Sequence, residues 1–577
     1  MRYIKHILAA IILISAAFPV YAECTGNKFV VWGDTQFQQP EFFDRVVKET
    51  ELLQPAFVLH VGDMIHGYSY DPENVRRQWK RFKKQIEPLT VPFYPTPGNH
   101  DLTTPEIIPL YGEAWGEDRY YYSFDHENIH VIVLNIYSET EPGVINEEQM
   151  NWLREDLQKT SDSANIFVSI HAPLHLDNTK EWKPVHEQLK KRPVRAVFTS
   201  HAHIYDHRVT DGIHYFCLNT SGITTLDNHL MGQSRHYLLV SVKKNDCKYA
   251  VITEDRIFPA DAVPPGQYEK AETYLSENQT IPIPDPAKSE VRIPAEITIA
   301  NKSPETRDYK LTWETDDYRW KFEPWGADFK LGSGEENNII FQIHGPKDEF
   351  SRKELPRLRV ETPYKNERGW STVLKWYYHL FAPPEIRARK LNGDINLDGE
   401  MEEAAWRTAP AITRLHTDDE GATTTEKNVV KVLYDNENLY VGMWGEEPQP
   451  EGLSAYASGG IPLVFGDDDF EIYLDPNRDM ETFYRMMVNP AGTTLSSGPE
   501  GLFTYDFYVE THIGQSFWSA EFRIPFSELN IDAPTEGDRW GFNVRRHRMQ
   551  AEPSRRDWSW MQNYPYQPGY FGLLRFD

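Results

Sequence analysis

The sequence predicts an α/β fold followed by two all-β sandwich regions, for three reasons. Short apolar segments alternate with amphipathic helical segments from about residue 27 to residue 254. A polar stretch punctuated by prolines then interrupts this pattern. After it, apolar and polar residues alternate with the period of half-buried strands, and no helical period is found up to Leu380. A chain of 577 residues has room for about three or four domains of ordinary size.

The first region is expected to contain buried strands joined by helices. The strands are expected at residues 29–32, 56–61, 91–94, 129–136, 165–170 and 194–199. The helices are expected at residues 41–53, 72–86, 147–158 and 182–191. Such alternation is typical of an α/β domain, in which the strands lead into loops at one edge of a sheet.

The rest of the chain is predicted to consist of a linker at residues 257–286 and two β-sandwich regions at residues 287–381 and 383–577. Prolines recur at short intervals in the linker. Residues 291–300 and 309–313 alternate as half-buried strands do. The strands expected in the last region lie at residues 429–434, 439–444, 470–474, 484–488 and 518–524.

The first residues have the features of an export signal. Arg2 and Lys5 supply positive charge, residues 7–20 are apolar, and Ala22 ends a small-residue cleavage site. We therefore expect residues 1–22 to be a signal peptide and the mature protein to be secreted or periplasmic. The alternative is a transmembrane anchor, which is disfavoured because the apolar run is short for a bilayer span and no stop-transfer segment follows.

The composition excludes two classes of protein. A formal net charge of −27 argues against a nucleic-acid partner, because binding to a phosphate backbone requires a basic face. Three cysteines in an exported chain are too few for a disulfide framework. Cys217 and Cys247 are expected on neighbouring strands, where they could form a disulfide or remain two buried free thiols.

Side chains with metal-ligand chemistry follow five of the expected strands. They are Asp34 and Gln36, then Asp63, then Asn99 with the neighbouring His100, then His171, and finally His201 and His203. An α/β fold gathers its active site at this edge of a sheet. Carboxylate, amide oxygen and imidazole together suit a pair of divalent or trivalent metal ions. Gly33, Gly62 and Gly98 precede ligands and permit the tight turns that present them.

The alternative is that these are ordinary turn residues and surface histidines. Turn chemistry explains Gly-Asp, but it does not explain Asn-His-Asp or His-x-His directly after strands. A serine-hydrolase site is not supported, because the sequence has no Gly-x-Ser-x-Gly elbow. A phosphate-binding loop of the Walker type is also absent from the sequence.

Residues 29–253 resemble the calcineurin-like metallophosphoesterases in the order of their motifs. These motifs are Gly-Asp-Thr-Gln, Gly-Asp, Gly-Asn-His-Asp, a single His and His-x-His. The resemblance implies a metallophosphoesterase domain at residues 23–256, folded as a two-sheet sandwich flanked by helices. It implies one metal ion held by Asp34, Gln36, Asp63 and His203. It implies a second metal ion, with Asp63 as the bridge, held by Asp63, Asn99, His171 and His201.

Two residues depart from the family pattern. Gln36 stands where the family usually has His, and Ser200 stands where it usually has Gly. Because an amide oxygen is a harder and weaker donor than imidazole, the first site is expected to bind its metal less tightly or to favour iron, manganese or magnesium. The implied cofactor is therefore two metal ions, drawn from Fe, Mn, Zn and Mg.

The reaction that the resemblance implies is in-line displacement at phosphorus by a metal-activated water. His100 corresponds to a family histidine that is not a ligand and that contacts the phosphoryl group or protonates the leaving alkoxide. Asp101 is expected to orient His100. The alternative for His100 is an ordinary loop histidine held by backbone hydrogen bonds.

The last region resembles the family 9 carbohydrate-binding modules. The matching stretches are residues 397–406, 432–441, 469–475, 517–525 and 570–576. The resemblance implies a sugar held between two aromatic rings and anchored by a Glu and an Arg. By motif position it implies a site formed by Phe465, Glu471, Arg485 and Tyr566. A cross-strand salt bridge is the alternative for Glu471 and Arg485. Residues 287–381 resemble immunoglobulin-like spacer domains.

Together these expectations describe a secreted metal-dependent phosphoesterase, a hydrolase with a dinuclear metal centre and a C-terminal carbohydrate-binding module. Its substrate would be a phosphoester, either a monoester or a diester, linked to a sugar or glycan. The alternative is a glycan-binding surface protein whose phosphoesterase-like domain is catalytically degenerate. The complete set of expected metal ligands argues against that alternative.

Overall fold

The structure is a computed structural model, and it does not describe every residue of the chain. It describes residues 27–577 apart from residues 37–39, 70, 138–142, 177–178, 222–227, 277, 284–289, 347–354, 418–421, 458–465, 503–504, 550, 552–554 and 560–566. The expected signal peptide at residues 1–22 lies outside the described residues. None of the described helices has both the length and the apolar composition needed to span a lipid bilayer.

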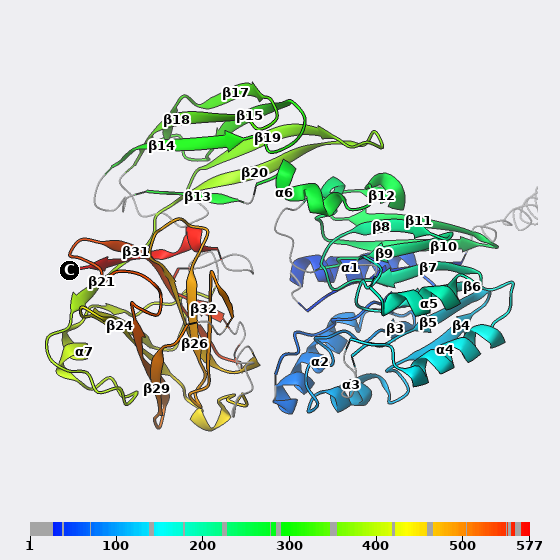
Figure 1. Ribbon diagram of the computed structural model, residues 1–577, viewed down its shortest axis with the longest axis horizontal. Coiled ribbons are helices and arrows are strands. Elements are labelled where there is room, and N and C mark those ends of the chain that lie inside the picture. The colour runs from blue at the N-terminus through cyan, green and yellow to red at the C-terminus, as the bar shows by residue number, and fades with distance from the viewer. Residues whose placement is uncertain are drawn as a thin grey trace, which may run out of the picture.

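The N-terminal region is a sandwich of two six-stranded sheets (Figure 1). The first sheet has the order β12 (Ile257–Pro259), β11 (Asp246–Thr253), β10 (His236–Lys243), β1 (Asn27–Trp32), β2 (Val58–His60) and β3 (Phe93–Pro95). The second sheet has the order β4 (Tyr122–His126), β5 (Ile129–Val133), β6 (Asn165–Ser169), β7 (Val194–Thr199), β9 (Ile213–Cys217) and β8 (Asp206–Thr210). Strands β1, β2 and β3 run parallel, as do β5, β6, β7 and β9.

Helices cover both outer faces of this sandwich, which confirms the α/β fold. They are α1 (Pro40–Leu53), α2 (Pro72–Ile86), α3 (Ile108–Trp115), α4 (Glu147–Lys159) and α5 (Trp182–Leu189). Trp32 of the first sheet is buried against Phe43 of α1, in a cluster that α2 and α3 complete. Leu153 of α4 belongs to the cluster on the second sheet. Phe29 and Phe167 meet between the sheets, so the order of layers is helix, sheet, sheet, helix.

Local signals explain why α2 and α4 begin where they do. Asp71 caps α2, because its side chain accepts a hydrogen bond from the backbone N–H of Glu73, and Pro72 occupies the first helical position. Asn146 caps α4 by accepting from the N–H of Gln149. These caps place both helices close to the predicted boundaries.

The segment expected as a linker at residues 257–286 has defined structure over most of its length. It contains β12, the short helical turns Ala260–Ala262 and Gln267–Lys270, α6 (Ala271–Tyr274) and β13 (Gln279–Pro282). Strand β12 pairs with β11 of the first sheet, and β13 pairs with a strand of the next region. Prolines at strand edges and turns explain the difference, since an edge strand tolerates the missing N–H group.

The middle region is a β-sandwich of two sheets around one apolar core. One sheet has the order β13, β20 (Ser371–Phe381), β19 (Arg357–Lys365), β15 (Arg307–Glu314) and β17 (Gly326–Leu331). The other has the order β14 (Val291–Ala300), β18 (Glu336–Gly345) and β16 (Lys321–Glu323). Trp313, Phe341 and Trp376 lie in the core between them. The predicted strands at residues 291–300 and 309–313 are confirmed.

The C-terminal region is a second β-sandwich, as predicted. Its strands follow the order β28 (Gly501–Leu502), β27 (Thr494–Gly498), β26 (Tyr484–Val488), β25 (Asp469–Asp475), β31 (Arg539–His547), β33 (Gly572–Phe576), β21 (Glu385–Lys390), β23 (Asn428–Tyr434), β24 (Asn438–Glu446), β30 (Phe517–Pro525) and β29 (Tyr508–Ile513). In addition, β22 (Ala411–Ile412) pairs with β23, β32 (Arg555–Asp557) pairs with β31, and α7 (Ala404–Thr408) precedes β22. Strand β21 pairs first with β33 and then with β23, so it joins the two halves around one core.

The two described cysteines are both free, and they lie in different sheets. Cys217 ends β9 in the second sheet, whereas Cys247 lies in β11 of the first sheet. The expectation of neighbouring strands was therefore wrong. The reason is topological, because β9 pairs with β7 and β8, while β11 pairs with β10 and β12. Of the two alternatives, free thiols are the state in the structure.

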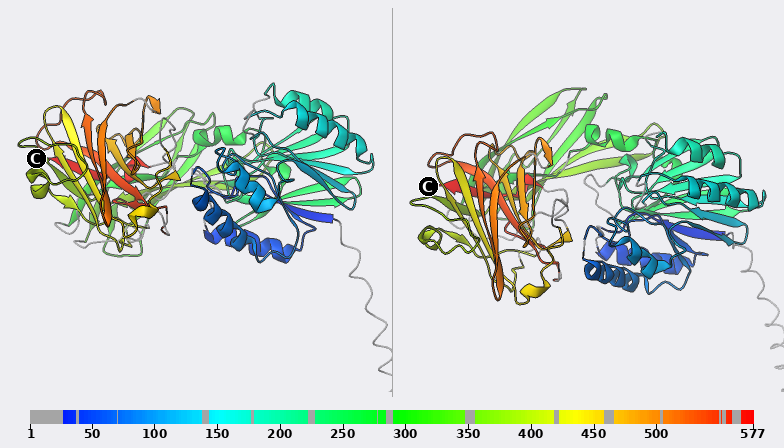
Figure 2. Two further views of the ribbon diagram at one scale, coloured as in Figure 1. Left: turned by 90° about the horizontal axis from the view of Figure 1, so that it is seen from below. Right: turned by 60° about the horizontal axis from the view of Figure 1, so that its bottom comes forward.

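The three regions contact one another pairwise. Leu230 of the N-terminal region belongs to the core of the middle sandwich. Phe381 at the end of β20 packs with Tyr473 and Tyr570 of the C-terminal region. The N-terminal and C-terminal regions lie side by side in both views of Figure 2, with the middle region joining them. Oγ of Ser69 donates a hydrogen bond across that contact to a carbonyl group of the C-terminal region.

Candidate metal centre

The expected ligands lie together where strands of both sheets of the N-terminal region end. Strands β1, β2 and β3 are parallel neighbours, so their carboxyl ends open at the same edge of the first sheet. Strands β6 and β7 are parallel neighbours in the second sheet. The backbone N–H of Gln36 donates to the carbonyl oxygen of Asp63 at 3.1 Å, and this bond ties the loops after β1 and β2 together.

Three of the expected ligands have left-handed backbone conformations. The φ angles are 57° at Asp63, 69° at His201 and 53° at His203. Residues other than glycine adopt this conformation at an energetic cost, and such strain concentrates at functional sites. Gly98 permits the close packing beside Asp63, because a Cβ atom at position 98 would lie 2.1 Å from Oδ1 of Asp63. The backbone conformations of these loops thus position the candidate ligand side chains.

A first group of ligands surrounds Asp34. Nε2 of His203 lies 2.6 Å from Oδ2 of Asp34. Nε2 of Gln36 lies 3.1 Å from Nε2 of His203 and 3.2 Å from Oδ2 of Asp63. The four side chains that the resemblance assigned to one metal ion are therefore linked, since Gln36 contacts Asp34, Asp63 and His203.

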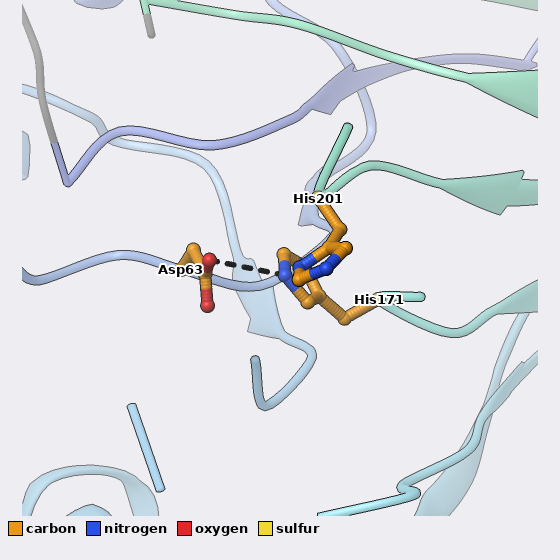
Figure 3. A group of neighbouring side chains, drawn as sticks. All are labelled: Asp63, His171 and His201. Atoms are coloured by element: carbon orange, nitrogen blue, oxygen red, sulfur yellow. Dashed lines mark ion pairs between the residues drawn. The ribbon is translucent and has the colours of Figure 1, made fainter. Parts of the chain in front are cut away.

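A second group surrounds Asn99 and His171. Nε2 of His171 lies 3.1 Å from Oδ2 of Asp63 and 3.2 Å from Oδ1 of Asn99, and the same amide oxygen lies 2.8 Å from Nδ1 of His201. Figure 3 shows Asp63, His171 and His201 converging, with the contact between Asp63 and His171 dashed. One ligand atom from each of these three residues lies within 4.8 Å of the others. Asp63 belongs to both groups, as a bridging ligand must.

These donors fit a pair of metal ions. The set combines carboxylate, amide oxygen and imidazole, which are ligands of divalent and trivalent transition metals and of magnesium. Oε1 of Gln36 is buried and has no hydrogen-bond partner among the described residues. A buried oxygen without a partner loses free energy unless a cation or a donor satisfies it. Rotation of the amide would turn this oxygen toward the carboxylates, where a cation would be bound.

The charges of the cluster also favour bound cations. Burial opposes ionisation of Asp34, but His171 and His203 outweigh it and hold the pKa of Asp34 below its usual range. Burial likewise opposes charge on His171, yet Asp63 and Asp34 raise the pKa of His171 to about 9. Asp34 raises the pKa of His203 against the effect of burial. The negative charge of the buried Asp34 and Asp63 therefore attracts positive charge to the cluster. A bound metal ion would take the place of the histidine protons, because imidazole is a ligand only in its neutral form.

His100 lies beside the ligands and is held by the backbone. Its N–H donates to Oδ1 of Asp63 at 2.9 Å, and Nδ1 contacts the carbonyl oxygen of His66. Nε2 of His100 lies 3.9 Å from Oδ2 of Asp63. The ring packs edge-on against Tyr68, with centroids 4.4 Å apart. Burial lowers the pKa of His100, which favours a neutral ring.

Asp101 has a different environment from the one expected. Its carboxylate accepts hydrogen bonds from the backbone N–H groups of Gly98 and Asp63, both at 2.9 Å, and from those of Met64 and Ile65. The expectation that Asp101 orients the His100 ring is not supported by these contacts, because the carboxylate instead joins the loops after β2 and β3. Burial and the nearby Asp63 raise the pKa of Asp101 to about 8.

Two further residues complete the site and were not anticipated. Ser200 receives a hydrogen bond at Oγ from the N–H of Asp34 at 3.2 Å and donates to the carbonyl oxygen of Leu218 at 2.6 Å. It thereby links the two sheets. The hydroxyl of Tyr68 accepts from Nδ2 of Asn99 at 3.1 Å. The signal for Tyr68 was its place in the loop after β2, the same loop that carries Asp63.

The residues assigned to a sugar site are only partly described. Phe465 and Tyr566 lie outside the described residues. Glu471 on β25 and Arg485 on β26 are brought together, with Nε of Arg485 2.6 Å from Oε2 of Glu471. Both side chains are buried. The cross-strand ion pair, which the sequence left open, is therefore the arrangement present.

Two family models match separate parts of the chain. Residues 27–205 match the family model for calcineurin-like phosphoesterases. Residues 397–572 match the family model for carbohydrate family 9 binding domain-like regions.

The curated relatives align with only part of the chain. "Probable purple acid phosphatase 20" of Arabidopsis thaliana is 29% identical over 174 residues, which cover 25% of this chain and 38% of that protein. "Acid phosphatase type 7" of Mus musculus is 28% identical over 162 residues, which cover 26% of this chain and 36% of that protein. The chain thus spans well under half the length of the curated relatives it matches.

Solved structures align with the two ends of the chain separately. A dimetal phosphatase from Danio rerio aligns at 15% identity with a TM-score of 0.33, covering 40% of this chain and 98% of that one. A family 9 carbohydrate-binding module from Caldicellulosiruptor kristjanssonii, solved in complex with cellotriose, aligns at 22% identity with a TM-score of 0.26. That alignment covers 33% of this chain and 93% of the module.

Proposed function

We infer that the N-terminal region, which matches the calcineurin-like phosphoesterases, hydrolyses phosphoesters with a dinuclear metal centre. One observation carries this proposal. The ligand side chains form two groups that share Asp63, and each group contains the mixture of oxygen and nitrogen donors that a transition metal requires. A structural ion-pair cluster has no need of three imidazoles and two amides in such an arrangement.

The side chains would divide between the two metal ions as follows. One ion would be held by Asp34, Gln36, Asp63 and His203. The other would be held by Asp63, Asn99, His171 and His201. When bound, the two ions, drawn from Fe, Mn, Zn and Mg, would lower the pKa of a water molecule and neutralise the phosphoryl oxygens.

His100 would take up a proton at Nε2 from solvent beside the negatively charged phosphoryl group and deliver it to the leaving oxygen, because the neutral ring carries its only proton on Nδ1. Its Nδ1 is fixed by the His66 carbonyl group, so Nε2 is the atom that would face the phosphoryl group. Asp101 would act as a positioning residue, because its carboxyl group accepts hydrogen bonds from the backbone N–H groups of Asp63 and Gly98 and so joins the loops that carry Asp63 and Asn99. Tyr68 would orient the Asn99 amide so that its oxygen faces His171 and His201.

We further infer that the protein is exported and that its C-terminal region binds carbohydrate. The start of the sequence supports export, and the family match at residues 397–572 supports carbohydrate binding. The substrate would then be a phosphoester linked to a sugar or glycan. The domains would comprise residues 23–256, 287–381 and 383–577.

A substrate panel combined with metal analysis tests the proposal. We expect the purified protein to carry close to two metal ions and to hydrolyse phosphomonoesters or phosphodiesters. Chelation should remove the activity, and replacement of Asp63, which belongs to both groups, should remove both ions. A folded protein that lacks metal, or that binds metal but cleaves no phosphoester, would support the alternative of a glycan-binding protein with a degenerate phosphoesterase region.

A further inference from the structure

A cavity of about 330 Å³ lies between the N-terminal and C-terminal regions. Helix α2 and the loop before it form one wall, and the end of β31 with the residues after it forms the other. The lining includes Gln36, His66, Gln78, Arg81, His547 and Met549. Its volume falls within the range of about 300–1,000 Å³ that is usual for small-molecule sites.

The two walls are in direct contact beside the cavity. Oγ of Ser69 donates a hydrogen bond of 3.3 Å to the carbonyl oxygen of Gly466. At Gly466 the two backbones lie so close that an added Cβ atom would be 1.8 Å from the carbonyl oxygen of Tyr68. The N-terminal and C-terminal regions are therefore in close contact near the cavity.

The cavity adjoins the candidate metal centre. Gln36 lines it, and Nε2 of Gln36 lies 3.2 Å from Oδ2 of Asp63. His66 also lines it, and the carbonyl oxygen of His66 contacts Nδ1 of His100. If a phosphoryl group lies at the metal ligands, the group esterified to it would therefore extend into this cavity or along its opening.

His547 is anchored so that it can serve as a donor in the cavity. Its Nδ1 lies 3.0 Å from Oδ1 of Asp469 and 3.2 Å from Oε1 of Glu471, and Arg485 pairs with Glu471. Burial opposes charge on the ring, but the two carboxylates outweigh it and raise the pKa of His547 to about 9. Because the carboxylates occupy Nδ1, Nε2–H is the donor that remains for a ligand.

We propose that this cavity binds the alcohol portion of the substrate, which is a hydroxyl-rich group of monosaccharide size. The C-terminal region supplies His547 and Met549 to recognise this group. The residues that the family resemblance assigned to sugar, Glu471 and Arg485, act here through His547 as positioning residues. The proposal rests on the proposed phosphoesterase function, because the cavity would receive a group attached to a phosphorus atom at the metal ligands.

The lining chemistry supports a hydroxyl-rich ligand. Amide side chains such as Gln78 both donate and accept hydrogen bonds, as hydroxyl groups do. Met549 and Phe82 offer apolar surface for the C–H face of a sugar ring. Arg81 and His547 add donors, and no carboxylate is found among the described lining residues. A cationic alcohol such as an amino alcohol is therefore disfavoured.

A binding experiment tests the cavity without relying on turnover. Calorimetry on the full chain, stripped of metal by a chelator, would compare glucose 6-phosphate with inorganic phosphate. We expect glucose 6-phosphate to bind more tightly. Arg81→Leu on one wall and His547→Ala on the other should each weaken its binding about tenfold, as expected for losing a charged hydrogen bond.

Matched controls lie outside the cavity, one on α2 and the other on a different strand of the C-terminal region. Lys80→Leu on α2 and His512→Ala on β29, where His512 pairs with Glu400, should leave the binding of glucose 6-phosphate unchanged. If His547→Ala fails to fold because Asp469 and Glu471 lose their partner, Met549→Glu serves instead. That variant introduces a carboxylate into the cavity and should weaken binding at least as much.

A kinetic experiment separates this inference from the proposed function. In the metal-loaded protein, variants on both walls should lower the ratio of kcat/KM for glucose 6-phosphate to that for para-nitrophenyl phosphate about tenfold. Hydrolysis with an unchanged ratio would overturn the inference alone. Tight binding of glucose 6-phosphate without hydrolysis of any phosphoester would overturn the proposed function alone. No preference for glucose 6-phosphate, or an effect confined to one wall, would overturn the inference.

Discussion

Gln36 and His100 both approach Asp63, but through different chemistry. Nε2 of Gln36 lies 3.2 Å from Oδ2 of Asp63 and also contacts Asp34 and His203, whereas His100 is joined to Asp63 chiefly through its backbone N–H. The amide of Gln36 thus contacts three other candidate ligands, whereas the imidazole of His100 contacts a carbonyl group. Substitutions at these two positions should therefore have separable effects on metal content and rate.

For His100→Ala we expect both metal ions to stay bound while kcat falls about a hundredfold or more, because a positioned proton donor is lost. Elemental analysis and steady-state kinetics on the same preparation check this. His126→Ala, in strand β4 away from the ligands, is the control and should keep both properties. Loss of a metal ion from His100→Ala would show that His100 is a ligand.

For Gln36→Ala we expect lower occupancy of one metal ion, with partial recovery of the rate in excess metal. Gln36→His should raise the affinity of that site, because imidazole is a stronger donor to transition metals than an amide oxygen. Titration of the chelated protein with Mn²⁺ or Zn²⁺ measures both effects. Unchanged occupancy and rate in Gln36→Ala would remove Gln36 from the ligand set.

The sequence predicted that the candidate ligands lie together, but it did not predict all of the residues that support them. Asp34, Asp63 and His171 could be found because each directly follows an apolar strand, and parallel strands bring such positions together. The contacts of Asp101 and Ser200 could not be found in the same way. They join loops from different strands and different sheets, so they depend on how the sheets pack.

At the scale of elements, prediction succeeded where a local signal and burial agreed. Helix α2 has a capping Asp, a proline at its first position and an apolar stripe, and β5 is an uninterrupted apolar run. Helix α3 was missed, because it is short, mostly apolar and has no side-chain cap. The segment at residues 257–286 was expected to be a linker because of its prolines. It contains β12 and β13, which the local sequence does not indicate because they pair with strands that lie elsewhere in the chain.

Strand β10 contains a buried histidine that should make the N-terminal region sensitive to acid. Nδ1 of His236 contacts the carbonyl oxygen of Ser234, and Nε2 accepts from the N–H of Asn219 at 3.3 Å. The second contact requires a neutral ring, because a protonated Nε2 cannot accept a hydrogen bond. Burial lowers the pKa of His236 to about 4. The unfolded chain therefore binds the proton more readily than the folded one between pH 6.5 and 4.

We accordingly expect the free energy of unfolding to fall as the pH drops through that range, by up to about 3 kcal/mol from this residue. The slope is positive with pH because the unfolded state carries more protons. Urea denaturation of the chelated protein at several pH values would measure it. His236→Gln should flatten the slope, whereas replacing the more exposed His126 should not. An equal slope in His236→Gln would contradict the assignment.

At the scale of the whole molecule, three cores meet at three interfaces. The N-terminal core depends on loops that hold the candidate ligands, whereas the C-terminal core is a separate cluster of apolar side chains. A metal ion that binds the folded state stabilises only the region that contains its ligands. The regions should therefore respond differently to the removal of metal.

We expect calorimetry to show a transition for the N-terminal region that moves down by about 5–10 °C on chelation, in line with a few kcal/mol of lost ligand binding. The transition of the C-terminal region should move less. Readdition of metal should restore the first transition. The Asp63→Ala variant provides the control, since chelation should no longer shift its melting profile. A uniform shift of all transitions would indicate that the three regions unfold as one unit.

The backbone contact at Gly466 sets how far apart two of these regions can be. Any side chain at this position would have to displace the Tyr68 carbonyl group, because a Cβ atom would lie 1.8 Å from its oxygen. The absence of a side chain at this position therefore lets the segment before β25 pack directly against the loop before α2. A larger residue there would widen the opening above the ligands without altering one of them. A substitution at Gly466 alone, which is not a candidate metal ligand, could in this way change the range of substrate sizes among related chains.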